Sequence, residues 1–362
     1  MNSANIEKKI PSWATRKELT TPVLYMVFNR PEITQESFNA IREAKPKKLY
    51  VAVDAPRVNR KDDEENQAKV IQIVKNVDWD CNVKYLIHEK NLGCSRAGIA
   101  AWNWLFSQED RMIFVEDDGV PSVSFFYYCQ ELLEDYKDND KIAYIGGVNY
   151  GMKRGEASYF FTRQCAATYA MGTWKRVYDL YEYDMASYPK YRNKKSFKEA
   201  FSNKKSYYGH LLMFDSYVDS LKKGIQQNTY DVQMLYLVHK YDKYSIYPNT
   251  NMVSNIGLAG GANNNVDVNS AFYKAYHNRP RFELIELKHP AEISINKEFD
   301  AEMAEYRQSF LGRSRWQNSY ICFVHYVNAY FHGLYKFIRT IKRKFSVSYT
   351  HLRAHETRGN LV

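Results

Sequence analysis

The sequence predicts an α/β fold built on a doubly wound, mostly parallel sheet. Over the first 150 residues, short apolar runs alternate with amphipathic segments of helical length, which is typical of βαβ units. Several of these runs end directly in polar or acidic residues, and open α/β sheets bind ligands outside the carboxyl ends of their strands. After Tyr150 short mixed strands and aromatic loops replace the alternation, so we expect a mixed second half of the same domain.

Three of the predicted strands, at residues 22–28, 48–53 and 111–115, are mainly apolar runs, as is typical of strands that helices cover on both faces. Altogether we expect strands at residues 22–28, 48–53, 82–88, 111–115, 142–145 and 244–247. Helices are predicted where apolar residues recur with helical spacing, at residues 34–43, 68–77, 95–106, 125–136 and 230–241.

Three consecutive acids, Glu116, Asp117 and Asp118, follow the predicted strand at 111–115. Clustered carboxylates repel one another unless a cation joins them. Mg²⁺ and Mn²⁺ prefer oxygen ligands and commonly take one or two carboxylates together with phosphate oxygens. The run therefore predicts a metal site that also holds a phosphorylated substrate. The alternative is that Asp118 and Gly119 only form a turn.

Composition narrows the class of protein further. The chain has 362 residues, 45% of them hydrophobic and 15% aromatic, and it lacks an apolar run long enough to span a membrane. Its N-terminus shows no apolar signal region. The five cysteines are widely spaced, without a Cys-x-x-Cys pair, so we expect reduced thiols in a cytoplasmic protein.

The net charge of +10 is concentrated near the C-terminal end. Residues 307–346 contain eight Lys or Arg and no acid, so the rest of the chain is close to neutral. The segment 320–345 reads as an amphipathic basic helix with aromatic residues, which favours peripheral binding to an anionic membrane surface, here the inner face of the cytoplasmic membrane. A packing helix or a dimer contact is the alternative. Nucleic acid ranks below both, because no base-reading module accompanies the basic stretch.

The residues at the C-terminal end, 346–362, do not look like native sequence. Residues 347–357 resemble the in-frame translation of an adapter used to build sequencing libraries. We therefore treat 346–362 as a non-native tail, exclude its histidines as metal ligands and expect the native C-terminus to be missing.

The motifs of the chain follow one another in a recognisable order. They are Val23–Phe28 followed by Asn-Arg-Pro, a strand ending in Asp54, Asn91-Leu-Gly93, Val-Glu-Asp-Asp with Pro121 and Phe125-Phe126, Tyr169-Ala-Met-Gly-Thr-Trp174, Tyr230-Asp231-Val-Gln233, and the stretch Pro248–Gly257. From about Pro22 to Ala262 this set resembles GT-A-fold bacterial glycosyltransferases of the nucleotide-diphospho-sugar transferase superfamily. The layout is also similar to that of animal N-acetylglucosaminyltransferase I.

The resemblance implies transfer of a sugar from a nucleotide-diphosphate donor to an acceptor hydroxyl, in bacterial cell-surface polysaccharide or lipopolysaccharide synthesis. The acceptor would be a glycan or a lipid-linked molecule. By the same resemblance Asp118 binds Mn²⁺ or Mg²⁺, Glu116 and Asp117 face the donor, and Asp231 is the catalytic base. A single base without a nucleophilic partner implies one displacement with inversion. The alternatives are a structural carboxylate at Glu116 and a first-turn helix acid at Asp231.

Further donor contacts follow from the resemblance. Asp54 would contact the nucleotide base, Arg30 and Arg96 would reach the base or the diphosphate, and Gly172 with Trp174 would shape the floor beneath the sugar. Each of these charged residues could instead be a surface charge in a loop. For Arg96 this second interpretation is favoured. A buried tryptophan such as Trp174 is more often part of the core.

The sequence as a whole is expected to divide into six parts. They are an N-terminal tail at 1–20, a nucleotide-sugar-binding half at 21–150, an acceptor-side catalytic half at 151–270, a connection at 271–311, the basic aromatic segment at 312–345 and the tail at 346–362. One departure concerns the loop 258–265, where relatives often have a His and this chain has Asn263 and Asn264. That departure motivates a second hypothesis, a non-catalytic nucleotide-sugar-binding protein at the membrane. A third, a sugar nucleotidyltransferase, ranks low because no glycine-rich basic loop follows the first strand.

Overall fold

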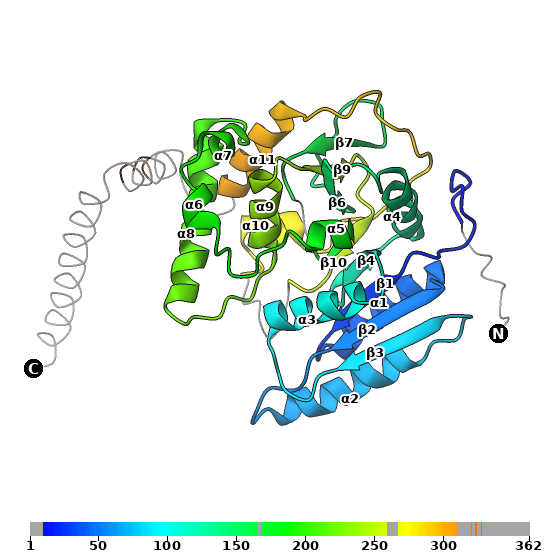
Figure 1. The fold of residues 1–362 in the computed structure, drawn as a ribbon. Coiled ribbons are helices and arrows are strands. Elements are labelled where there is room, and N and C mark those ends of the chain that lie inside the picture. The colour runs from blue at the N-terminus through cyan, green and yellow to red at the C-terminus, as the bar shows by residue number, and fades with distance from the viewer. Residues whose placement is uncertain are drawn as a thin grey trace, which may run out of the picture.

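The computed structural model describes residues 10–165, 168–258 and 267–309, together with residues 320, 323 and 327. Its centre is an eight-stranded sheet with the strand order β3-β2-β1-β4-β8-β6-β9-β7 (Figure 1). The strands of this sheet are β1 (Val23–Val27), β2 (Lys48–Val53), β3 (Asn82–Ile87), β4 (Arg111–Glu116), β6 (Ile142–Gly146), β7 (Tyr159–Thr162), β8 (Ala170–Trp174) and β9 (Tyr244–Pro248).

The first four strands form a parallel, doubly wound half. β1 lies between β2 and β4, and all the pairs among these strands are parallel. The helices α1 (Pro31–Ala44) and α2 (Lys61–Lys75) pack against each other, and α1 also contacts α4 (Val123–Asp135). Figure 1 shows α3 (Cys94–Phe106) on the opposite face from α2. The chain therefore reverses its winding between β1 and β4, which is the switch point where such sheets bind ligands.

The second half of the sheet is mixed. β8 runs antiparallel to both β4 and β6, β9 is parallel to β6, and β7 is antiparallel to β9. Trp102 of α3 packs against rings of both halves, edge-on to Phe114, Tyr178 and Tyr181 and tilted to Tyr230. The helices of the second half are α5 (Lys175–Tyr178), α6 (Tyr188–Tyr191), α7 (Lys195–Glu199), α8 (Lys204–Lys222), α9 (Asp231–Lys240), α10 (Ala271–Tyr276) and α11 (Lys297–Ser309).

A small second sheet joins the turn after β4 to the C-terminal part of the domain. It pairs β5 (Gly119–Pro121) antiparallel with β10 (Val253–Asn255), so that Asn255 lies opposite Gly119. The amide of Ile256 also donates to the carbonyl of Asp118 at 2.9 Å. The chain around residue 256 is thereby held against the end of β4.

The predicted fold class is confirmed for the described residues. The predicted helix that differs most in extent is α2, which begins at Lys61, seven residues before the predicted start. Its first turn contains Asp62, Asp63 and Glu64, and acids at that position are stabilised by the helix dipole. Within the part of the chain that is described, no helix is both long and apolar enough to cross a membrane. Apart from residues 320, 323 and 327, the predicted segment 312–345 and the tail 346–362 lie outside the described residues.

Candidate active site

A cavity of about 1060 Å³ opens at the carboxyl ends of β1, β2 and β4, at the switch point of the sheet. Pockets for small molecules commonly span roughly 300–1,000 Å³, so this one has room for more than one ligand. Six of the residues predicted to form the site line it, namely Arg30, Asp54, Glu116, Asp117, Asp118 and Asp231.

The acidic turn at the end of β4 is fixed by three neighbouring segments. The amide of Asp117 donates to the carbonyl of Met26 in β1 at 2.9 Å. The amide of Glu116 donates to the carbonyl of Tyr169, just before β8, at 2.8 Å. With the β5–β10 pairing after Gly119, these bonds orient the three carboxylates toward the cavity.

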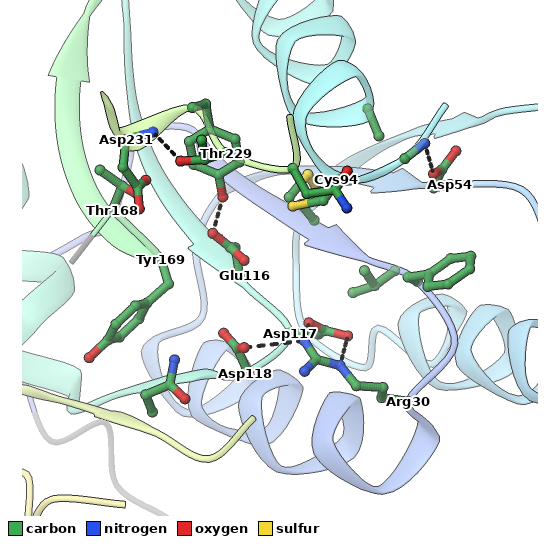
Figure 2. Close-up of a pocket in the computed structure, with 18 of the residues that line it drawn as sticks. Arg30, Asp54, Cys94, Glu116, Asp117, Asp118, Thr168, Tyr169, Thr229 and Asp231 are labelled. Carbon is green, nitrogen blue, oxygen red and sulfur yellow. Dashed lines mark hydrogen bonds and ion pairs between the residues drawn. The ribbon is translucent and has the colours of Figure 1, made fainter. Parts of the chain in front are cut away.

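Arg30, which precedes α1, is a cation already paired with the acidic turn. Its guanidinium binds Asp117 with two nitrogens, and its Nε–Oδ2 distance is 3.1 Å. The Arg30 Nη2 atom also lies 3.3 Å from Asp118 Oδ2 (Figure 2). Gly257 packs directly against Asp118 and Arg30. A Cβ at this position would overlap the Asp118 side chain and lie 2.6 Å from Arg30 Nη1. Close approach therefore requires glycine at this position.

The Asp118 carboxylate is buried at the edge of the cavity. Its Oδ1 atom is buried and has no hydrogen-bond partner in the described structure. Burial raises the pKa of the Asp118 carboxyl, and the charge of Asp117 adds to the rise, although Arg30 opposes it. Such an oxygen suits a divalent cation that takes its other ligands from phosphate and water. Over the described residues, no group of three or more His, Cys, Asp or Glu is placed so as to hold a metal ion.

Glu116 faces the second half of the domain. Its carboxyl accepts a hydrogen bond from the Tyr230 hydroxyl (Figure 2). Burial raises the pKa of Glu116 well above its usual range, and the charges of Asp118 and Asp231 add to this. Tyr230 is itself held by its packing on Trp102 at 5.4 Å between ring centroids. Glu116 therefore links the acidic turn to the segment that contains Asp231.

Asp231 is the first residue of α9, and it is exposed at the cavity wall. Its Oδ1 atom accepts a hydrogen bond from the hydroxyl of Thr168, which is buried just before β8 (Figure 2). The position suits both readings that the sequence left open, because a first-turn acid is favoured by the helix dipole and an exposed carboxylate can accept a proton.

Asp54 lines the cavity, but its carboxylate is used by the neighbouring loop. Oδ1 accepts from the amides of Ala55 (3.0 Å) and Leu92 (2.9 Å), and Oδ2 accepts from the Asn91 side chain (3.1 Å) and the Gly93 amide (3.0 Å). A carboxylate has about four acceptor sites, so these four bonds fill them. The arrangement makes Asp54 a positioning residue for the loop 91–93, and contact with a nucleotide base stays a prediction.

The loop 91–95 in turn holds the segment that leads to Asp231. The Gln226 side chain donates to the carbonyl of Leu92 at 2.8 Å, and the Ser95 hydroxyl donates to the carbonyl of Gln227 at 2.5 Å. Gly93 has a φ of 76°, and a Cβ there would lie 2.9 Å from Gln226 Nε2. The two halves of the cavity wall are thus joined by hydrogen bonds from side chains to backbone carbonyls.

Three predicted site residues lie away from the cavity. Arg96 is exposed on the first turn of α3 and is not among the lining residues. Gly172 and Trp174 belong to β8, whose antiparallel register places Ala170 beside Val115 but Trp174 beside Arg111, at the opposite end of β4. Trp174 is buried and donates to the carbonyl of Leu133 at 3.0 Å. The floor predicted for Gly172 and Trp174 is therefore not formed by them.

Several lining residues were not predicted from the sequence. Thr168 gave no signal, because its role depends on a contact with a residue 63 positions away. Asn255 lines the cavity and Gly257 packs against Asp118; both belong to the quoted motif, but no role was assigned to them. Phe28 and Arg57 also line the cavity, with the guanidinium 5.7 Å from the ring centroid. Of the loop 258–265, only Leu258 lies within the described residues.

Comparison with known proteins finds weak structural likenesses. No protein-family model matches the chain, and no curated protein matches it. Among solved structures it is similar to TarS 1–349 of S. aureus (15% identity, TM-score 0.32, 45% of this chain and 50% of that one). It is also similar to HddC from Yersinia pseudotuberculosis (10%, 0.24, 34% and 57%) and to a UDP-glucose pyrophosphorylase complexed with UDP-glucose (8%, 0.27, 44% and 79%). The chain spans about half the length of the TarS structure that it matches.

Proposed function

We propose that this protein is an inverting, metal-dependent glycosyltransferase that moves a sugar from a nucleotide-diphosphate donor to an acceptor hydroxyl. One observation supports it above all: the acids at the end of β4 and Asp231 at the start of α9 line a single cavity at the switch point of the sheet. The sequence separates them widely, and the fold brings them to the two sides of one ligand-sized space.

The charge of the cavity supports the need for a divalent cation. Among the described lining residues, the acids are Asp54, Glu116, Asp117, Asp118 and Asp231, and the cations are Arg30 and Arg57. Arg57 is bound to Asp63 at 2.6 Å, and Arg30 to Asp117. A diphosphate would add negative charge to a wall that is already acidic. Asp118 Oδ1 would hold Mn²⁺ or Mg²⁺ there, and such an ion stabilises the charge of a departing diphosphate.

Asp231 would act as the base of the transfer. The acceptor oxygen forms a bond to the anomeric carbon of the donor, the bond from that carbon to the diphosphate oxygen breaks, and the proton of the acceptor passes to Asp231. Thr168 keeps the carboxylate in one orientation for this step. General bases of this kind contribute roughly 10²–10⁴-fold in rate.

A single displacement is the simplest route with these residues. Two displacements would need a nucleophile on the other side of the donor. Cys94 lines the cavity, but burial raises the pKa of its thiol, and nearby carboxylates add to the rise, so little thiolate forms. Glu116 is engaged by Tyr230. The proposal therefore includes inversion at the anomeric carbon.

The pathway is proposed from the sequence resemblance alone. Bacterial glycosyltransferases of this kind imply a role in cell-surface polysaccharide or lipopolysaccharide synthesis, with a glycan or lipid-linked acceptor. A cytoplasmic location, with peripheral attachment to the membrane through 320–345, belongs to the same proposal.

The test is turnover of nucleotide-sugars by the full-length protein with and without Mn²⁺. We expect Mn²⁺-dependent hydrolysis or transfer that Asp118→Ala and Asp231→Ala each reduce at least a hundredfold, while the exposed Asp62→Ala leaves it unchanged. Unchanged turnover in either of the first two variants would remove that residue from its role. Pyrophosphate release from a nucleoside triphosphate and a sugar phosphate would indicate a nucleotidyltransferase. Nucleotide binding without any turnover would indicate a non-catalytic protein.

A further inference from the structure

Arg30 holds two acids of the proposed metal and donor site in different ways. Both oxygens of Asp117 accept hydrogen bonds from its guanidinium, through Nε and Nη2. Asp118 is joined to it by an ion pair of 3.3 Å between Oδ2 and Nη2 (Figure 2). Because the pairing with Asp117 is bidentate and the other is not, the contact with Asp118 is the weaker of the two.

The fold leaves Arg30 little room to withdraw from this position. It is the N-cap residue of α1, its carbonyl accepts from the Thr34 amide at 2.8 Å, and Pro31 follows as the first helical residue. At the far end of the side chain, a Cβ on Gly257 would lie 2.6 Å from Nη1, so the backbone of that glycine lies against the guanidinium. Arg30 is therefore held beside the acidic turn at both ends of its side chain.

The guanidinium of Arg30 is a permanent positive charge. Burial opposes that charge, but the carboxylates of Asp117 and Asp118 outweigh burial and raise the pKa of Arg30 above its usual range. Charges of buried groups are screened by salt much less than exposed ones. A divalent ion at Asp118 would share that carboxylate with Arg30 Nη2 and would be repelled by the guanidinium. In the free protein Arg30 therefore weakens the affinity of the acidic turn for a second cation.

A nucleoside diphosphate reverses this balance. Its phosphate oxygens are ligands for Mn²⁺ or Mg²⁺, and guanidinium groups bind phosphate with parallel hydrogen bonds. Arg30, Asp117 and Asp118 line the same cavity, so a diphosphate there can meet both the guanidinium and the ion. Its negative charge would then offset the repulsion between the two cations.

We propose that Arg30 makes binding of the divalent ion conditional on the diphosphate. In the free protein the guanidinium takes the place of the ion at Asp118, and the ion binds tightly only together with a nucleoside diphosphate. Arg30 then remains on Asp117 and exchanges its contact with Asp118 for one with a phosphate oxygen. The inference rests on the proposed function, because it concerns the donor and the ion of the same reaction. Such coupling is reciprocal, so the ion must also strengthen binding of the nucleotide.

The test measures binding of Mn²⁺ alone to the full-length protein, from the loss of the electron paramagnetic resonance signal of the free ion. We expect the wild type to bind Mn²⁺ weakly without a nucleotide. Arg30→Met and Arg30→Gln remove the charge, and each is expected to bind Mn²⁺ roughly tenfold more tightly or better, because the repulsion is gone. Arg30→Lys keeps the charge and should bind Mn²⁺ as weakly as the wild type. Neutral variants that bind no more tightly than the wild type, or tight binding by Arg30→Lys, would overturn the inference.

Two further variants locate the effect. Arg192 forms a similar bidentate pair with Asp215, at 2.8 and 2.6 Å, and is not among the lining residues of the cavity. Arg192→Met also frees a carboxylate, so it is the matched control and should bind Mn²⁺ like the wild type. Adding Asp118→Asn to Arg30→Met should abolish the gain in affinity. An equal gain in Arg192→Met, or an undiminished gain in the double variant, would place the ion elsewhere and contradict the inference.

The wild type separates the inference from the proposed function. Calorimetry gives its affinity for UDP and for GDP with and without Mn²⁺, and we expect Mn²⁺ to strengthen binding of at least one of them roughly tenfold or more. If the donor is turned over but Mn²⁺ neither strengthens nucleotide binding nor binds more tightly with the nucleotide present, the inference fails and the transferase remains. The same comparison decides the matter if circular dichroism shows that neither neutral variant folds. If no nucleotide binds and no nucleotide-sugar is turned over, the proposed function fails, and the inference fails with it.

Discussion

Thr168 donates a hydrogen bond to the carboxylate of Asp231, and this contact joins the start of β8 to the start of α9. Thr168 is buried, whereas Asp231 is exposed at the cavity. A buried hydroxyl that orients an exposed acid is well placed to fix a catalytic base. The same two elements also contact the acidic turn, through the carbonyl of Tyr169 and the hydroxyl of Tyr230.

Replacing Thr168 by valine removes the hydroxyl and retains the shape of the side chain. We expect Thr168→Val to lower kcat about tenfold, because a hydrogen bond to a charged group contributes about 1.5–3 kcal/mol and only part of it acts on the transition state. The KM for the donor should change little. Steady-state kinetics checks this, with Thr168→Ser expected near the wild type. A larger effect on donor KM than on kcat would place Thr168 in donor binding instead.

Replacing Gly257 by alanine tests the close packing around Asp118. The new Cβ would overlap the Asp118 side chain and approach Arg30 Nη1. We expect at least a tenfold weaker affinity for a nucleoside diphosphate with Mn²⁺, measured by calorimetry, because a displaced carboxylate loses its geometry for the cation. Gly155→Ala is the control for added volume, since nothing lies within 4 Å of a Cβ there; its φ is positive (64°), unlike that of Gly257. Equal affinities in the two variants would contradict the packing argument.

Replacing Asp54 by asparagine tests its role in the loop 91–93. The amide of asparagine would face backbone donors that now bind a carboxylate, so we expect a loss of about 1–3 kcal/mol in the free energy of unfolding. Because this loop holds the segment before Asp231, kcat should also fall. Urea denaturation and kinetics measure the two effects. Weaker nucleotide binding at unchanged stability would instead favour the base contact predicted from the sequence.

Asp63 gives a prediction about pH. Hydrogen bonds from Arg57 lower the pKa of the Asp63 carboxyl to about 2, and Asn29 adds a bond of 2.6 Å. A group with a lowered folded-state pKa stabilises the protein above its unfolded-state pKa, near 3.8, and this contribution is lost as pH falls toward 2. We expect Asp63→Asn to lose about 1–3 kcal/mol of stability at pH 7 and less at pH 3. The exposed Asp62→Asn should show no such pH-dependent difference, and a constant difference for Asp63→Asn would refute the linkage.

Much of the fold follows from local sequence patterns. The runs that form β1, β2, β4 and β6 are continuously apolar because helices or neighbouring layers cover them, and all four are buried in the structure. Local sequence patterns could not predict the direction in which β8 runs. Its pairing with β4 is antiparallel, and only this long-range fact shows that Tyr169 reaches the site while Trp174 does not.

Part of the candidate site could also be predicted from local sequence patterns. Glu116, Asp117 and Asp118 follow a strand, so general rules place them at the sheet edge, whereas Asp231 was found only through the resemblance. The bonds of Asp54 to backbone amides and the contact of Thr168 with Asp231 leave no trace in the sequence, because they depend on where distant loops meet. Arg96 shows the converse, since this charged residue follows the loop 91–93 but is exposed and does not line the cavity.

A crystal structure of the full-length protein with Mn²⁺ and a nucleoside diphosphate tests the central claim most directly. Anomalous scattering would locate the ion independently of the ligand density. We predict one Mn²⁺ between Asp118 Oδ1 and the diphosphate, with the nucleotide inside the cavity at the ends of β1, β2 and β4. A nucleotide bound elsewhere, or a diphosphate in the cavity held by Arg30 without any anomalous peak at Asp118 under saturating Mn²⁺, would contradict the account.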